Sequence, residues 1–143
     1  MARPSNALHI VIVLVVVALS GVRGDAQSPT TFVVSGSIRG ASGAHTIHVA
    51  VWNAEGFLTT PVQETAFVAA RDVMYAFRVP AGRWAISAFE DLNENGVLDR
   101  GVFGPKEPTG FVVPFRSHRR PRFVDVAMEI DHDIGGADIV LGH

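Results

Sequence analysis

Short apolar segments alternate with turn residues from residue 32 to residue 141. The apolar segments are rich in Val, Ile, Phe and Trp, and Gly, Pro, Asn and Asp separate them. Short runs of this composition are typical of β-strands. We therefore expect seven strands, at residues 32–38, 46–53, 63–70, 73–79, 83–90, 123–130 and 137–141. Turn signals that recur at intervals of about 8–12 residues favour an all-β fold, a single antiparallel β-sandwich.

Apolar residues at every second position indicate which face of a strand enters the core, because successive side chains point to opposite faces. Two strands show this alternation, through Ile47, Val49 and Val51 in one and through Val124, Val126, Met128 and Ile130 in the other. Within residues 27–143 no segment keeps a helical period for three turns, although residues 62–72 also suit a short helix.

One long stretch, residues 91–122, carries no strand pattern and is expected as an inserted loop. A loop of this length in a compact domain is usually functional or held in place by something else. The preceding strand runs directly into Asp91, which places this residue at the end of a rigid element. Phe103, Phe111 and Phe115 lie in the stretch, where they would cover the sandwich core or, alternatively, form a ligand-binding patch.

The N-terminal segment, residues 1–26, has the features of a secretory signal peptide. Arg3 provides a positive charge, residues 10–19 form an unbroken apolar run, and small residues occur at Gly24 and Ala26. The run is shorter than the roughly 20 apolar residues that a membrane span needs. We expect cleavage, a single domain at residues 27–143 and a periplasmic or secreted location; an uncleaved N-terminal membrane anchor is the alternative.

The composition limits how the domain can be stabilised and which classes of partner it can bind. The chain has no cysteine, so an exported domain gains no disulfides and has to rely on its core or on a bound ion. Its 12 Lys and Arg nearly balance its 14 Asp and Glu, and the formal net charge is −2. Nucleic acid is therefore not expected as a partner, because proteins that bind it carry a basic surface.

Residues 91–99, Asp-Leu-Asn-Glu-Asn-Gly-Val-Leu-Asp, place oxygen-bearing side chains at alternating positions. The candidate metal ligands are Asp91, Asn93, Asn95, the Val97 carbonyl and Asp99, with Gly96 at the sharp turn. Calcium binds six to eight oxygen atoms that a tightly turning backbone wraps around it. The spacing therefore predicts a Ca²⁺ loop.

A helix–loop–helix calcium hand is excluded, because it needs helical flanks and a bidentate Glu at its twelfth position, where this chain has Val102. Glu107 is the candidate for the missing carboxylate, if Gly101 and Gly104 let the chain fold back. So few charges predict a weak site, with a Kd of about 10⁻⁴–10⁻³ M. The alternatives are another metal or an ion-free loop, because Asx residues and glycine also form turns by themselves.

The sequence offers no catalytic group. No histidine adjoins the loop in the sequence, and His45 and His48 would lie on opposite faces of a strand, which does not suit a shared zinc ion. Glu90 and Asp91 also point to opposite faces and do not form an acid–base pair. A metal-assisted hydrolase with an open coordination position is kept only as an alternative hypothesis.

A basic cluster lies at the end of the long stretch. Its members are Arg116, His118, Arg119, Arg120 and Arg122. Prolines on both sides favour an extended, exposed segment. The cluster could make weak contact with an anionic surface such as lipid head groups, or it could be a solvated loop.

Several motifs occur in combination along the chain. They lie at residues 49–53, 57, 81–86, 91–99, 103–107, 110–111 and 123–127. Together they resemble a bacterial family of exported proteins defined as domain-of-unknown-function family 2141. The resemblance covers nearly all of residues 27–143. It implies a transthyretin-like (prealbumin-like) or immunoglobulin-like sandwich, a periplasmic or secreted location and no known catalytic activity.

The function expected from these features is that of a non-enzymatic exported β-sandwich with a Ca²⁺-stabilised loop, acting as a binding or envelope-associated module. Its partner would be an unknown protein, a glycan or a small apolar ligand. The alternative is a periplasmic carrier that holds a small apolar molecule between its sheets or under the Phe-rich loop.

Overall fold

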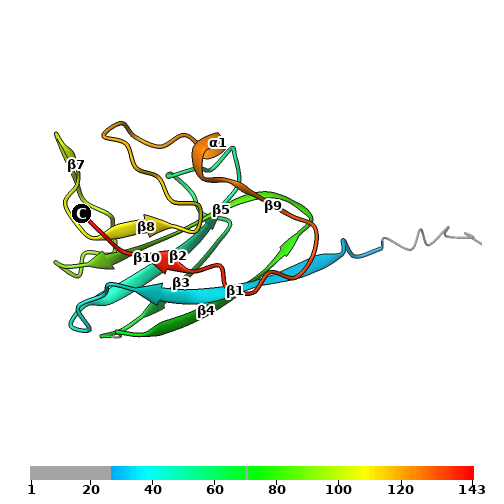
Figure 1. Ribbon diagram of the computed structural model, residues 1–143, viewed down its shortest axis with the longest axis horizontal. Coiled ribbons are helices and arrows are strands. Elements are labelled where there is room, and N and C mark those ends of the chain that lie inside the picture. The colour runs from blue at the N-terminus through cyan, green and yellow to red at the C-terminus, as the bar shows by residue number, and fades with distance from the viewer. Residues whose placement is uncertain (1–26, 70) are drawn as a thin grey trace, which may run out of the picture.

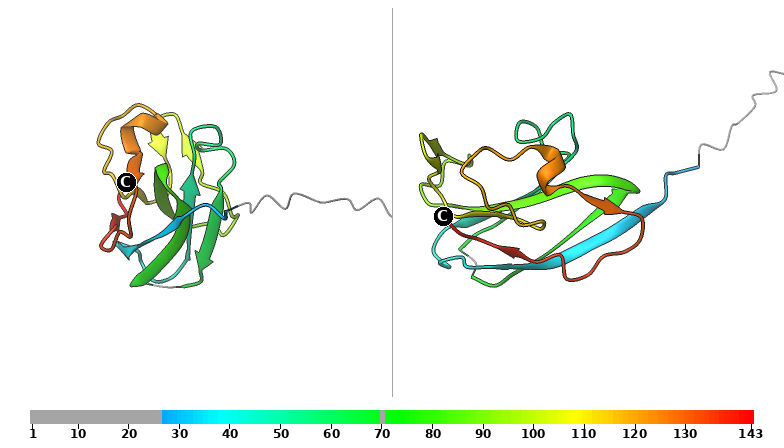
Figure 2. Two further views of the ribbon diagram at one scale, coloured as in Figure 1. Left: turned by 90° about the vertical axis from the view of Figure 1, so that its right-hand side faces the viewer. Right: turned by 45° about the horizontal axis from the view of Figure 1, so that its top comes forward.

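A computed structural model describes residues 27–69 and 71–143. The signal segment expected at residues 1–26 lies outside the described residues. Two layers of strands pack face to face (Figures 1 and 2). Within the described part of the chain, no helix is long and apolar enough to cross a membrane.

The strands form two main sheets. The first, called the β1 sheet, has the order β10–β1–β4 and comprises β10 (Ile139–Val140), β1 (Thr31–Arg39) and β4 (Val73–Pro80). The second, called the β5 sheet, has the order β3–β2–β5–β8 and comprises β3 (Gln63–Phe67), β2 (Thr46–Trp52), β5 (Gly82–Asp91) and β8 (Thr109–Phe111). β9 (Met128–Ile130) pairs with the start of β5. The predicted all-β sandwich is confirmed, and the long pairings β1–β4 and β2–β5 are antiparallel.

Alternating apolar side chains from both sheets form the core. In β2, the side chains of Ile47, Val49 and Val51 are 0% exposed, as their alternation predicts. β4 has the same period, and every second residue from Val73 to Val79 is buried. Burial of an aliphatic side chain contributes about 1.5–3 kcal/mol relative to its exposure, so the two inner faces supply the main driving force for folding.

The short helix considered for residues 62–72 is not formed. β3 instead pairs with β2, from Ile47↔Phe67 to Val51↔Gln63. This strand ends at Phe67, earlier than expected, and the strand expected at residues 137–141 is reduced to β10. The other strands expected before residue 91 match β1, β2, β4 and β5 closely.

The strand predicted at residues 123–130 is wrong in its first half. α1 (Phe123–Val126) is a single helical turn, and only β9 is extended. An Asp125 carboxylate oxygen accepts the N–H of Arg122 at 2.8 Å, and such local bonds compete with strand pairing. Val124 is therefore 58% exposed, whereas Val126 and Ile130 are buried as predicted.

The stretch 91–122 is not one continuous loop. β8 lies within it and extends the β5 sheet, with Ser87 opposite Phe111 and Phe89 opposite Thr109. β6 (Arg100–Gly101) and β7 (Gly104–Pro105) form a separate hairpin. Strands of two or three residues are too short to show a period of two, which is why the sequence pattern did not reveal them.

The C-terminal segment closes one edge of the sandwich. β10 runs parallel to β1, and Gly142 forms a bridge to Thr109 of β8, so this segment touches both sheets. A Cβ atom at Gly36 would lie 2.0 Å from the Ala137 carbonyl oxygen, so only glycine permits this close crossing. The buried Tyr75 hydroxyl donates a hydrogen bond to the same carbonyl.

Candidate metal-binding loop

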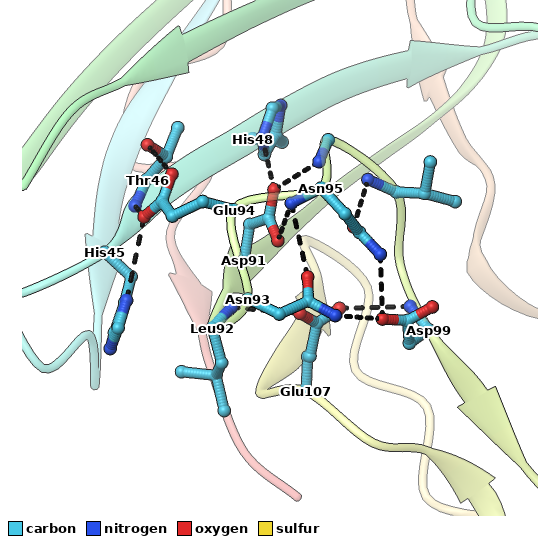
Figure 3. A network of polar contacts seen from close by, with 12 residues as sticks. His45, Thr46, His48, Asp91, Leu92, Asn93, Glu94, Asn95, Asp99 and Glu107 are labelled. Carbon is cyan, nitrogen blue, oxygen red and sulfur yellow. Dashed lines mark hydrogen bonds and ion pairs between the residues drawn. The ribbon is translucent and has the colours of Figure 1, made fainter.

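The loop of residues 91–99 begins at the end of β5, where Asp91 lies opposite Thr46 of β2. The Asp91 side chain is only 1% exposed although it carries a carboxylate. The remaining candidate side chains gather around it (Figure 3). The strand therefore fixes the first residue of the loop, as the sequence predicts.

Backbone N–H groups of the loop surround the Asp91 carboxylate. Its Oδ1 accepts the N–H of Asn95 at 3.1 Å, and its Oδ2 accepts the N–H of Gly96 at 2.6 Å. Gly96 has a φ of +78°, a conformation that glycine adopts without strain. Burial by itself would raise the pKa of Asp91, but the N–H groups of Gly96 and Asn95, together with His48, outweigh it and hold this pKa below its usual value.

The two asparagines connect Asp91 to Asp99. Their amide nitrogens donate to Asp99 Oδ2, from Asn93 at 2.6 Å and from Asn95 at 3.0 Å. Their Oδ1 atoms accept backbone N–H groups two residues later, at 3.2 Å for Asn93 and 2.9 Å for Asn95. The structure thus brings together the four side chains that the sequence singles out, in a turn held by its own Asx residues.

Glu107 approaches the loop from the chain beyond the hairpin. Its Oε1 accepts the N–H of Leu92 at 2.9 Å, and its Oε2 accepts the N–H of Asp99 at 3.0 Å. The Glu107 residue is only 3% exposed. The Glu107 carboxylate therefore binds both ends of the loop. The chain folds back after the hairpin and brings Glu107 beside the loop, as its role as a candidate ligand requires.

The loop carries oxygen ligands of the kinds that a hard cation such as Ca²⁺ prefers. They are carboxylate and amide oxygens gathered on one turn. Across residues 27–69 and 71–143, no Lys or Arg forms an ion pair with Asp91, Asp99 or Glu107. In the same ranges, no three His, Cys, Asp or Glu side chains are grouped closely enough to hold a metal ion by themselves.

A histidine does lie beside the loop, contrary to the impression given by the sequence. His48 Nε2 is 3.3 Å from Asp91 Oδ2, and its Nδ1 is 3.5 Å from Glu64 Oε1. The imidazole stacks on Phe89, with ring centroids 4.8 Å apart. Only the pairing of β2 with β5 brings His48 and Asp91 together, and no local sequence signal encodes that register.

The neighbouring β2 end also holds Glu94. The Thr46 N–H and hydroxyl donate to the two Glu94 carboxylate oxygens at 2.8 and 2.7 Å. These bonds lower the pKa of Glu94 below its usual value. They also hold Glu94 at a φ of 56°, a conformation that non-glycine residues seldom adopt.

Glu90 and Asp91 point to opposite faces of β5, as predicted. Glu90 faces the core side, where its carboxylate accepts the Ser42 N–H at 3.0 Å and the Ser42 hydroxyl. Both residues are 1% exposed. Glu90 thus provides a buried carboxylate adjacent in sequence to Asp91 but outside the loop.

The basic cluster divides into two kinds of arginine. Arg119 and Arg122 form ion pairs with Asp125, at 2.7 and 3.2 Å, and hold the turn of α1. Their hydrogen bonds, that of Arg119 foremost, hold the pKa of Asp125 well below its usual range. Among the described residues, Arg116 and Arg120 take part in no ion pair.

A groove with a volume of about 1270 Å³ lies on the outer face of the β5 sheet. Its floor includes His48, Trp52 and Phe89, and its sides include residues 100–105 and 114–121. Trp52 Nε1 donates to Ser87 Oγ at 2.8 Å across the floor. The three phenylalanines of the stretch, Phe103, Phe111 and Phe115, border this groove and do not enter the core between the sheets.

A family model described as "Uncharacterized protein conserved in bacteria (DUF2141)" matches residues 37–135. This span includes residues 91–99, Glu107 and the strands β2 to β9. The search of curated proteins and the search of solved structures gave no match.

Proposed function

The chain belongs to the bacterial family DUF2141, and from this premise we propose that it is an exported, non-enzymatic β-sandwich whose loop 91–99 binds Ca²⁺. The loop serves to order residues 92–108, so that the domain acts as a binding or envelope-associated module in the periplasm or outside the cell. The features of residues 1–26 support export.

One observation carries the calcium proposal. Three carboxylates, those of Asp91, Asp99 and Glu107, lie on or against a single turn without a Lys or Arg partner among the described residues. Two of these residues are at most 3% exposed. Buried charges are normally paired or bound to metals, because removing them from water is costly.

The residues of the chain have distinct roles in this proposal. Asp91, Asn93, Asn95, the Val97 carbonyl and Asp99 would hold the cation. A bound cation would supply positive charge to three carboxylates whose ionisable partner among the described residues is His48, beside Asp91. The two Glu107 oxygens fasten the ends of the loop through Leu92 and Asp99. Each Glu107 oxygen already accepts one backbone N–H, so Glu107 would bind the cation only through its remaining lone pairs.

Thermal unfolding with and without calcium tests the proposal. A ligand that binds only the folded state stabilises it, and a site of the predicted affinity should gain about 1–2 kcal/mol at about 5 mM Ca²⁺. We expect a higher Tm with Ca²⁺ than with EDTA and little change with Mg²⁺. An identical Tm in Ca²⁺ and EDTA would exclude the calcium site.

Two neighbouring carboxylates provide the matched variants. Asp91→Asn should abolish the calcium-dependent rise in Tm, because it removes a charge from the loop. Glu90→Gln alters an equally buried carboxylate on the opposite face and should retain the rise, even if it lowers the Tm in EDTA. A calcium-dependent rise that survives in Asp91→Asn would place the ion elsewhere.

A second candidate function is a carrier of a small apolar ligand, and the groove on the β5 sheet favours it. The groove has an aromatic floor at Trp52 and Phe89, and its volume is large enough to hold a small molecule. The space between the sheets is filled by core side chains instead. Native mass spectrometry of the purified protein should then reveal a co-purified lipid or pigment, which Phe89→Ser should reduce.

A further inference from the structure

The β6–β7 hairpin carries two apolar side chains at its tip. Arg100 pairs with Pro105 and Gly101 with Gly104, so Val102 and Phe103 form the two-residue turn between them. Val102 is 95% exposed and Phe103 is 97% exposed, the highest values among the large apolar side chains that the structure describes. The hairpin projects from the body of the sandwich at the label β7 (Figure 1).

The tip is exposed because hydrogen bonds hold the base of the hairpin in place. The Lys106 N–H donates to the Asp99 carbonyl at 2.9 Å, directly below the paired strands. Glu107 then binds the N–H groups of Leu92 and Asp99. The tip is therefore held away from the core, although Phe103 would bury a large apolar area if it packed inward.

Cationic residues lie beside this apolar tip in the sequence and in the groove that the hairpin borders. Arg100 and Lys106 flank it in the sequence, and Arg116 and Arg120 border the same groove as the hairpin. Within residues 27–69 and 71–143 none of these four forms an ion pair. The pKa of Arg100 is lowered mainly by partial burial and further by the positive charge of Arg120. The guanidinium groups of Arg100 and Arg120 therefore lie close enough to repel each other.

An apolar tip with cations at the base of its hairpin and in the adjoining groove matches the surface of an anionic bilayer. The cations can bind lipid phosphates while the apolar side chains enter the boundary between head groups and acyl chains. A protein partner fits less well, because a stable interface buries roughly 1,200 Å² or more and two side chains supply only a fraction of it. We propose that the β6–β7 hairpin docks on an anionic lipid bilayer through Val102 and Phe103, with Arg100, Lys106, Arg116 and Arg120 on the lipid phosphates.

Sedimentation with lipid vesicles tests this docking. The full chain is incubated in EDTA with vesicles of phosphatidylcholine containing about 30% phosphatidylglycerol, and we expect binding that is lost in pure phosphatidylcholine and weakens in high salt. EDTA keeps calcium out of the experiment, so its outcome is independent of the calcium proposal. Residues 1–26 are the same in every variant, so a difference between variants reports on the substituted side chains.

The decisive variant is V102S/F103S, with V68S/M74S as its matched control. Val68 and Met74 are also exposed, at 81% and 72%, but Val68 directly follows β3 and Met74 belongs to β4, outside the hairpin. We expect the tip variant to bind about tenfold less and the control to bind like the original chain. R100Q/R120Q should reduce binding and its salt dependence. Equal losses in tip variant and control would overturn the proposal.

A gain of signal complements the loss of binding. Phe103→Trp places an indole at the tip, and its emission should shift to shorter wavelength when anionic vesicles are added. An unshifted spectrum with bound protein would show that another surface docks. A dimer that the tip variant disrupts, with no binding to vesicles, would assign the hairpin to a second copy of the chain and overturn the lipid assignment.

Discussion

The outward-facing side chains of β4 are exposed, whereas those of β2, and of β5 from Ala85 onward, are partly or fully buried. In β4, Met74, Ala76 and Arg78 face solvent. On the β5 sheet, Trp52 and Phe89 line the groove together with residues 100–105 and 114–121. α1 packs on this side of the molecule as well, away from β1 (Figure 2). Among the residues that the structure describes, loops and α1 therefore cover the outer face along β2 and β5 and leave that of β4 bare.

This difference shows where the candidate chemistry can arise. On the covered face a carboxylate can be buried beside a histidine, as Asp91 is beside His48, while loops complete its hydrogen bonds. On the bare face a side chain remains in water and acquires no special environment. The candidate loop, the groove and the hairpin all belong to the covered side.

The largest expected effect compares the two outer faces directly. Trp52→Ala should lower the free energy of unfolding by about 2–4 kcal/mol, because it opens a cavity and removes the bond to Ser87. Met74→Ala on the bare face should change it by no more than about 0.5 kcal/mol. Urea unfolding of both variants provides the measurement. Equal changes would show that the outer face of the β5 sheet is not packed.

The next prediction tests a feature that the two sheets share. The C-terminal segment crosses Gly36 of the β1 sheet and Gly110 of the β5 sheet, where a Cβ would lie 2.4 Å from the Val140 carbonyl oxygen. Gly36→Ala and Gly110→Ala should each cost about 1–3 kcal/mol through overpacking. Gly135→Ala, where a Cβ would meet no atom within 4 Å, is the control. A neutral Gly36→Ala would contradict the tight crossing.

A smaller effect is expected at the floor of the groove. Ser87→Ala removes the acceptor of the Trp52 indole N–H and should cost about 0.5–1.5 kcal/mol. Ser87→Thr keeps a hydroxyl and should recover part of this loss. Trp52 fluorescence and urea unfolding would follow both, and a stabilised Ser87→Ala would show that the bond contributes nothing.

The smallest effect concerns pH and the turn of α1. Because Arg119 and Arg122 depress the pKa of Asp125, its ionised form stabilises the fold at pH values above the unfolded pKa of about 4. This contribution is lost as the pH falls through the lower folded pKa. The Tm of the original chain should therefore exceed that of Asp125→Asn at pH 7, and the difference should shrink as the pH falls below about 4. A difference that is independent of pH would exclude the ion pairs as its cause.

Much of the fold could be predicted from the sequence. The alternation of Ile47, Val49 and Val51 identifies a buried face without reference to any neighbour, and it is confirmed by their complete burial. The membership of the bacterial family was likewise indicated by motifs and is confirmed by the matched span. The turn at α1 was missed, because the alternation of Val124 and Val126 also suits a strand and Arg119 acts on Asp125 from outside the segment.

The candidate site divides in the same way. The sequence alone determined the longer strands before residue 91 and the oxygen-rich turn of residues 91–99, because period-two burial, Asx turns and glycine act over a few neighbouring residues. Only the tertiary structure decided that His48 lies against Asp91, that Glu107 fastens both ends of the loop, and that Val102 and Phe103 stand in solvent. These contacts depend on strand register and on the path of the chain through three short strands. Neither is specified by local preferences, since both follow from how the two sheets pack as a whole.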